Sequence, residues 1–297
     1  MGEYIIRMLE KAARNGDVKA QYVLGEMYVN GILCEINYDK AEKWWKLASK
    51  KNDDAKAGLA VLYMKQNKNY IEIYKLLEEA ANNGNVLAQS NLGIAYFRGD
   101  SGIEQNYEKA VKWLKEAAAV GDKTAQNDLA LCYLEGRSVK KDIQKAIKLF
   151  ESSVNQGFPQ AYMNLGKIYY EGNSIEKNYA KAEKYCIELV KMGYVIYYDL
   201  LGDIYREGGY GVEKDETKAY ICYHRLMNLI NLMINVKKID KNYGNDLKIL
   251  EQVIKSLNKK IKLLDEKIED NEAKCIRNLL QKYMTFGYNN NQLIIIN

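Results

Sequence analysis

Apolar and small residues recur along this chain at helical spacing, and the same arrangement returns several times. In the stretch AYMNLGKIYYEG, which starts at Ala161, the residues Ala161, Leu165 and Tyr169 are four positions apart and fall on one face of a helix. Closely similar stretches begin at Ala20, Ala88 and Ala125. A catalytic motif normally occurs once in a domain, so a recurring phrase is better explained as part of the framework.

The small residue that follows the leucine of this phrase occurs six times, at spacings of 33 to 37 residues. These positions are Gly25, Ala60, Gly93, Ala130, Gly166 and Gly202. A tyrosine stands three positions later in every copy, at Tyr28, Tyr63, Tyr96, Tyr133, Tyr169 and Tyr205. A period of this length predicts a solenoid of stacked helical repeats.

A second helical phrase follows the first in each copy, for example NYEKAVKWLKEAA from Asn106. It begins with Asn or Asp, which are good N-cap residues, and many copies end at a glycine that suits a left-handed C-cap. Each unit is therefore expected to be helix A, a short loop, helix B and a short turn. Residues 4–17 match a lone helix B. The sequence thus predicts an N-terminal half-repeat and six helix pairs over residues 1–235, which bury a continuous core by stacking.

Residues 236–297 do not follow the repeat and are predicted to be a helical extension. They contain a heptad pattern formed by Leu247, Leu250, Ile254, Leu257, Ile261, Leu264 and Ile268. We favour a capping hairpin that covers the open end of the solenoid; the alternative is a short coiled coil that forms a homodimer through 247–268. A small basic cluster is formed by Lys255, Lys259, Lys260 and Lys262. We favour a solvated flank of this helix for it, and the alternative is a site for nucleic acid or anionic lipid. A last helix near 271–285 and the tail 286–297 follow.

Composition narrows the class of protein. The chain is 47% hydrophobic, which is ample for a core, yet it has no apolar run long enough to cross a membrane and no signal-peptide pattern. Its five cysteines stand singly without a CxxC pair, which fits a reducing compartment and leads us to expect a cytoplasmic protein. The net charge of +5 is modest. Neither nucleic acid nor a membrane is therefore expected as a partner.

Catalytic and metal-binding patterns are missing from the sequence. It has one histidine, His224, and no HExxH, P-loop or GxSxG motif. A nucleophile with a positioned base is not recognisable either. We therefore expect no enzymatic activity, no cofactor and no metal site.

The phrases AQSNLGIAYFRG and NYEKAVKWLKEAAAVGD resemble the Sel1-like repeat family, which is related to tetratricopeptide repeats. The resemblance covers about residues 3–231. It implies an all-α, right-handed α/α superhelical solenoid whose helices A line the concave side, and a role as an adaptor that holds other proteins. The disulfide-rich secreted branch of the family is a poor fit, because paired cysteines are missing here.

Polar residues of helix A that lie off the apolar stripe are predicted to face this groove and to bind a protein or peptide. Asn side chains there suit the backbone of an extended peptide, and an acidic row of Glu135, Glu171 and Glu207 favours a basic segment. The alternative is a solvated face without a ligand. The full predicted set is Glu26, Asn91, Arg98, Asp128, Glu135, Asn164, Lys167, Glu171, Asp203 and Glu207.

These features favour a non-enzymatic scaffold or adaptor. Two other functions remain open at this point. One is a structural protein that oligomerises through the C-terminal heptad, and the other is a dedicated inhibitor of the immunity-protein type that blocks a single target.

Overall fold

The computed structural model describes residues 2–99, 102–173, 175–237 and 244–265, and within them the chain is all-helical. A single β-bridge joins Gly209 and Val212 in that part of the chain. The predicted all-α repeat fold is therefore confirmed. The helices are α1 (Gly2–Arg14), α2 (Val18–Asn30), α3 (Tyr38–Ala48), α4 (Asp53–Lys65), α5 (Tyr70–Asn82), α6 (Val86–Arg98), α7 (Tyr107–Ala119), α8 (Lys123–Glu135), α9 (Ile143–Val154), α10 (Pro159–Glu171), α11 (Tyr179–Lys191), α12 (Tyr197–Glu207), α13 (Glu216–Lys237) and α14 (Gly244–Asp265).

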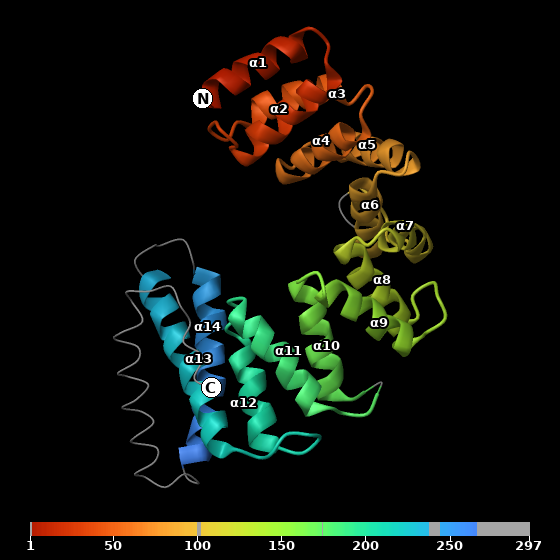
Figure 1. Ribbon diagram of the computed structural model, residues 1–297. Coiled ribbons are helices and arrows are strands. Elements are labelled where there is room, and N and C mark those ends of the chain that lie inside the picture. The colour runs from red at the N-terminus through yellow and green to blue at the C-terminus, as the bar shows by residue number, and fades with distance from the viewer. Residues whose placement is uncertain (1, 100–101, 174, 238–243, 266–297) are drawn as a thin grey trace. The chain divides into compact units, whose positions relative to one another are not determined.

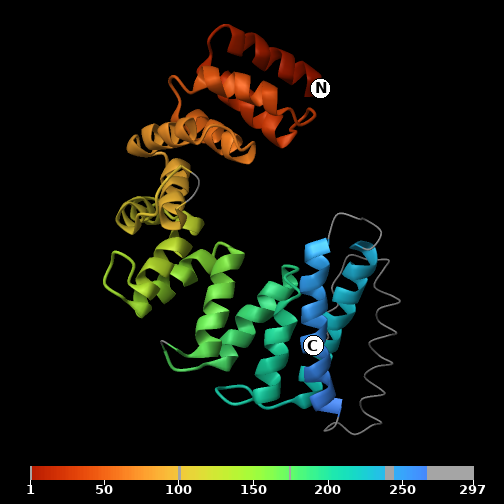
Figure 2. The same ribbon diagram turned by 180° about the vertical axis from the view of Figure 1, so that it is seen from behind.

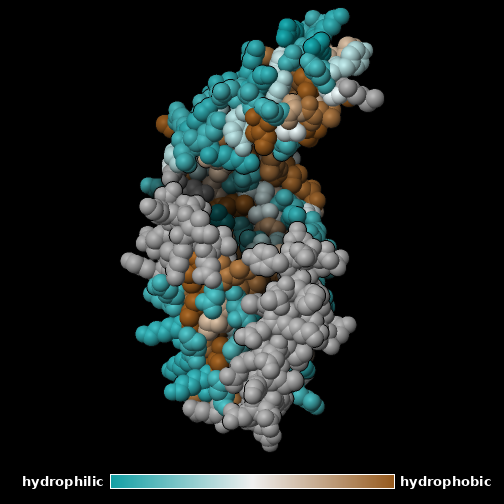
Figure 3. Space-filling view, turned by 90° about the vertical axis from the view of Figure 1, so that its left-hand side faces the viewer, coloured by the Kyte–Doolittle hydropathy of each residue, from teal (hydrophilic) through white to brown (hydrophobic). Residues whose placement is uncertain are grey.

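The helices fall into two compact units, Met1–Phe158 and Pro159–Asn297. In the first unit every helix packs on the next one, and α2, α4, α6 and α8 also contact one another in turn (Figure 1). These four helices are the predicted helices A, so they form one layer, while α3, α5, α7 and α9 are their helices B. Apolar side chains reach the surface of α1–α3, at the top of Figure 3.

Helix B begins with the expected cap. The side chain of Asn37 accepts a hydrogen bond from the Lys40 N–H at 2.9 Å, and the same bond is made by Asn106, Asp142, Asn178 and Asp215. A glycine follows most helices B. Gly121, for example, has φ +96°, a backbone conformation that residues with a Cβ rarely adopt.

The recurring small residue of helix A is required where a helix B side chain packs directly on it. A Cβ at Gly25 would come within 2.2 Å of the Trp45 ring. One at Gly202 would come within 2.3 Å of the Tyr223 ring. The two helices approach so closely at these points that only glycine fits.

The recurring tyrosine of helix A joins three helices. The Asn37 N–H donates to the carbonyl of Tyr28 at 2.8 Å, and Lys40 Nζ lies 5.0 Å from the centre of the Tyr28 ring. The Tyr28 hydroxyl donates to Glu10 on α1 at 3.0 Å. Lysines lie in the same way over Tyr96, Tyr133, Tyr169 and Tyr205. Tyrosine fills apolar space and still bonds through its hydroxyl, so it suits this position better than phenylalanine.

In the second unit α10–α14 follow the same packing, and α14 lies along α13 in both Figure 1 and Figure 2. Three heptad residues, Leu257, Ile261 and Leu264, are buried in a core that includes Tyr220 and Leu226 of α13. Thus the apolar seam of α14 is used within this chain. Ile268, the predicted helix near 271–285 and the tail 286–297 lie outside the described residues. None of the described helices has the length and apolar character needed to span a bilayer.

Candidate partner-binding surface

Two predicted groove residues of the first unit bond within their own helices. Glu26 on α2 is half-buried, and its carboxylate accepts a hydrogen bond from the Asn30 amide at 3.5 Å. Asn91 on α6 is also half-buried and donates to the carbonyl of Leu87 at 2.8 Å. Both lie on the layer of helices A, at positions that solvent partly reaches.

Asp128 on α8 differs from these because its side chain is only 6% exposed. Its Oδ1 accepts a hydrogen bond from Asn127 Nδ2 at 2.8 Å, whereas Oδ2 is enclosed and has no hydrogen-bond partner among the described residues. Burial raises the pKa of Asp128, although the Asn127 hydrogen bond and the positive charge of Arg98 on α6 oppose the rise. A buried carboxylate oxygen without a donor is costly. This position therefore favours any N–H or ammonium group that reaches it.

The acidic row is paired with cations of the same chain. Glu135, in the first unit, forms an ion pair with Arg137. Glu171, in the second unit, lies 3.7 Å from Lys167 Nζ and accepts a hydrogen bond from Asn173 at 3.2 Å. Because each carboxylate has a nearby donor or cation, its attraction for a distant basic group is reduced.

Asn164 and Lys167 are the other two predicted groove residues of α10. Asn164 is half-buried and interacts within the protein. The Lys167 side chain is 69% exposed. Of the two, Lys167 is the one that solvent and a partner reach most easily.

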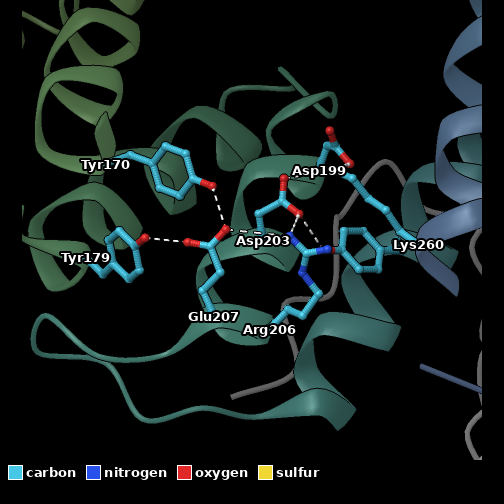
Figure 4. A network of polar contacts seen from close by, with 8 residues as sticks. Tyr170, Tyr179, Asp199, Asp203, Arg206, Glu207 and Lys260 are labelled. Carbon is cyan, nitrogen blue, oxygen red and sulfur yellow. Dashed lines mark hydrogen bonds and ion pairs between the residues drawn. The ribbon is translucent and has the colours of Figure 1, made fainter. Parts of the chain in front are cut away.

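Asp203 on α12 is the centre of a polar network (Figure 4). Its Oδ1 accepts a hydrogen bond from the Tyr223 hydroxyl at 2.7 Å and lies 3.0 Å from Arg206. Its Oδ2 lies 2.8 Å from Lys260 Nζ, and the same ammonium lies 2.8 Å from Asp199 Oδ1. Lys260 thereby ties α14 to two carboxylates of α12.

Glu207 extends this network toward α10 and α11. Its carboxylate accepts hydrogen bonds from the hydroxyls of Tyr170, at 3.1 Å, and Tyr179, and it lies 3.5 Å from Arg206 (Figure 4). Burial raises the pKa of both tyrosines, and the carboxylate of Glu207 adds to the rise. The hydroxyls therefore stay protonated and act as donors.

Sequence analysis missed the partners of this network. It placed Lys260 on a solvated flank, which is wrong, because the Lys260 side chain is only 18% exposed and forms two ion pairs. Lys255, Lys259 and Lys262 are exposed as predicted. The sequence did contain a partial signal: Asp199 stands at a position where the other helices A hold uncharged residues, such as Ser90 and Met163.

Chemistry beyond binding has little support in the described residues. No group of three or more His, Cys, Asp or Glu side chains there could hold a metal ion. Burial raises the pKa of the Cys132, Cys186 and Cys222 thiols to about 12 each. These thiols are therefore protonated at neutral pH and are poor nucleophiles. The ring of His224 packs on that of Tyr220, with ring centres 4.3 Å apart.

A family model described as Sel1 repeat matches residues 6–17, 18–53, 86–122, 123–158, 159–194 and 198–226. These segments make up well over half of the chain. The unmatched stretch 54–85 holds α5 and all of α4 except its first residue, and these two helices nevertheless pack as a repeat pair.

Solved structures give a second comparison. A Sel1 repeat protein from Oxalobacter formigenes is 27% identical with a TM-score of 0.61, over 71% of this chain and 85% of that protein. A protective antigen of uropathogenic Escherichia coli with an SLR fold is 24% identical with a TM-score of 0.46, over 93% of this chain and 67% of the antigen. An immunity protein from Pseudomonas aeruginosa is 19% identical with a TM-score of 0.42, over 64% of this chain and 74% of that protein. The last two similarities are too distant to bear on function. Among curated proteins no match was found.

Proposed function

Because this chain belongs to the Sel1 repeat family, whose members are generally protein-interaction scaffolds, we propose that it is a non-enzymatic adaptor that holds a protein or peptide on its helices A. In this proposal residues 1–235 form the repeat solenoid and 236–297 the extension that ends it. The observation that carries the proposal is the buried Asp128 carboxylate, whose Oδ2 has no hydrogen-bond partner among the described residues.

Because Oδ2 is enclosed in the unbound chain, the Asp128 side chain in this proposal turns toward the surface of the helix A layer when the partner binds, and there accepts a hydrogen bond from it. A backbone N–H of an extended segment, or the ammonium of a lysine, would recover the energy lost when the carboxylate was desolvated. Asn91 and Arg98 lie on the neighbouring helix α6 and add a polar amide and a positive charge to the same layer. Glu135 and Glu171 already form ion pairs within the chain, which lowers their attraction for a basic partner. The preference for such a partner stays a prediction.

The proposed place of action is a reducing compartment such as the cytoplasm. Cys34, Cys132, Cys186 and Cys222 are all free thiols, which supports this part of the proposal. A disulfide-stabilised extracellular repeat would use such cysteines in pairs.

The first test uses the purified chain as bait in an extract of its own cells, with the captured proteins identified by mass spectrometry. Asp128→Asn removes the charge with little change in shape. Glu116→Gln makes the same carboxylate-to-amide change on the exposed side of α7 and is the matched control. A protein captured by the wild type and by Glu116→Gln, and lost with Asp128→Asn, would support the proposal. Equal capture by all three would contradict it.

The basic-partner prediction needs separate variants. Glu135→Lys and Glu171→Lys reverse two row charges and leave Glu207, which bonds to Tyr170 and Tyr179, in place. Weaker binding by either variant, with a difference from the wild type that shrinks as salt is added, would support an electrostatic role for the row. Unchanged binding would remove the row from the site.

A further inference from the structure

Helix α1 presents apolar side chains to solvent. Tyr4 is 68% exposed, Ile5 39% and Met8 52%. The opposite side of α1 packs on α2, where Ala13 is buried and its carbonyl accepts a hydrogen bond from Gln21 at 2.9 Å. So α1 is covered on one side only, although apolar residues lie on both.

The other helices B bury or half-bury the positions that correspond to Ile5 and Met8, whereas the position of Tyr4 holds an exposed charged residue in them, such as Lys109 or Lys145. Counted back from the glycine after each helix, Ile5 corresponds to Ile73, Ala110, Ala146 and Ala182, all of which are 0% exposed. Met8 corresponds to Trp113 and Tyr185, which are 9% and 7% exposed, and to Leu76 and Leu149, which are half-buried. In those repeats helix B packs on helix A of the same pair. The uncovered face of α1 is therefore built to receive a helix.

The loop after α2 enlarges this face. Ile32 is 49% and Leu33 55% exposed, and a Cβ on Gly2 would lie 3.3 Å from the Leu33 Cβ, so the loop borders the start of α1. We call Tyr4, Ile5, Met8, Ile32 and Leu33 the N-terminal face; it lies on α1–α3, where Figure 3 shows apolar surface. A contiguous apolar patch rimmed by charges is typical of a protein–protein contact.

We propose that this face binds the same face of a second copy of the chain, with the two α1 helices antiparallel about a two-fold axis near Met8. The charges of α1 favour this occupant, because Glu3 lies in its first turn and Lys11 and Arg14 in its last. Antiparallel pairing brings the acidic turn of each helix to the basic turn of the other, so the surface is complementary to itself.

Lys11 has a defined place in this contact. Tyr4, Met8 and Lys11 follow one another at spacings of four and three, which puts them on one stripe of α1. Glu3 has an ion pair with Arg7 at 2.7 Å, yet its side chain is 81% exposed and accessible to a second cation. In the antiparallel pair, Lys11 of each copy meets Glu3 and Tyr4 of the other copy. This interface is separate from the groove on helices A, so either proposal can fail alone.

Sedimentation velocity of the full chain over a range of concentrations tests the proposal. The wild type is expected to show a monomer–dimer equilibrium. Met8→Glu places two like charges at the axis and should yield a monomer. Ile71→Glu, an equal change at an 81% exposed position of α5, should leave the equilibrium unchanged. A wild type that stays monomeric at its highest soluble concentration, or a dimer that survives Met8→Glu, would overturn the proposal.

A charge exchange separates this dimer from one formed with another geometry. Lys11→Glu should raise the dissociation constant about tenfold, and adding Glu3→Lys should restore it, because the pair is then reversed across the axis. Met8→Cys should cross-link two copies on mild oxidation, above the background of wild type and of Ile71→Cys; this readout holds even where Met8→Glu is unstable. Failure of both the rescue and the cross-link would overturn the arrangement.

Discussion

Lys260 Nζ of α14 lies 2.8 Å from Asp203 Oδ2 of α12, although 57 positions separate the two residues in the sequence. Their side chains are only 18% and 16% exposed. The same ammonium also pairs with Asp199 at 2.8 Å. This contact fixes the register of α14 on the last repeat, because the apolar seam alone would tolerate a slide along α13.

Lys260→Met should therefore destabilise the second unit. The change removes the cation that Asp199 and Asp203 share in a partly buried site, and only Asp203 keeps a second one, Arg206. This loss should lower the free energy of unfolding by about 1–3 kcal/mol. Urea unfolding measures the loss, and Lys259→Met on the exposed side of α14 is the control. Combining Lys260→Met with Asp203→Asn should cost less than the sum of the two. Equal losses for Lys260→Met and Lys259→Met would contradict the role given to this ion pair.

Two glycines of the second unit should respond in opposite ways to alanine. At Gly202 the added Cβ would meet the Tyr223 ring at 2.3 Å, whereas at Gly166 the nearest atom, Cys186 Sγ, is 3.6 Å away. Gly202→Ala should cost about 1–3 kcal/mol by overpacking. Gly166→Ala should be neutral or stabilise by up to about 1 kcal/mol, because alanine favours the helix. Thermal unfolding compares the two variants, and a loss of the same size at both sites would rule out the steric explanation.

The repeat could be predicted from the sequence because its residues contact near neighbours in the sequence, and these contacts recur from copy to copy. Tyr28 and Asn37, for example, make the same contacts with their neighbours as their counterparts further along the chain. Long-range polar pairing was not accessible in this way. The heptad identified the apolar side of α14, but which lysine would meet Asp203 depends on how α14 is placed against α12. Asp128 shows the same limit, since its position resembles that of Asn91 in the sequence but is far more buried in the structure.

Cysteine reactivity should follow burial. Cys132, Cys186 and Cys222 are buried, with thiol pKa values of about 12, so at pH 8 roughly one in ten thousand is a thiolate. Cys34 is half-buried, and its thiol lies 3.6 Å from the carbonyl of Met27. Among these four, iodoacetamide should modify Cys34 first in the native protein. Peptide mapping by mass spectrometry reads the order, and a urea-unfolded sample should show all four modified. Early labelling of Cys186 in the native chain would contradict its burial.

Asp128 should make the first unit less stable as pH rises through the acid range. Burial gives the folded carboxyl a pKa above its ordinary value of 3.8, so the folded state binds this proton more tightly than the unfolded chain does. The stability that the group contributes is full below about pH 3.8 and is lost as pH rises through the folded-state pKa.

The side chain of the variant Asp128→Asn does not titrate. The free energy of unfolding of the variant minus that of the wild type should therefore increase as pH rises through this range, and should stay constant at higher pH. Urea unfolding at a series of pH values from about 4 to 7 measures the difference, with Glu116→Gln, which should run parallel to the wild type, as the control. A difference that decreases as pH rises would contradict the prediction, because it would mean that the folded carboxylate is stabilised by a hydrogen-bond donor.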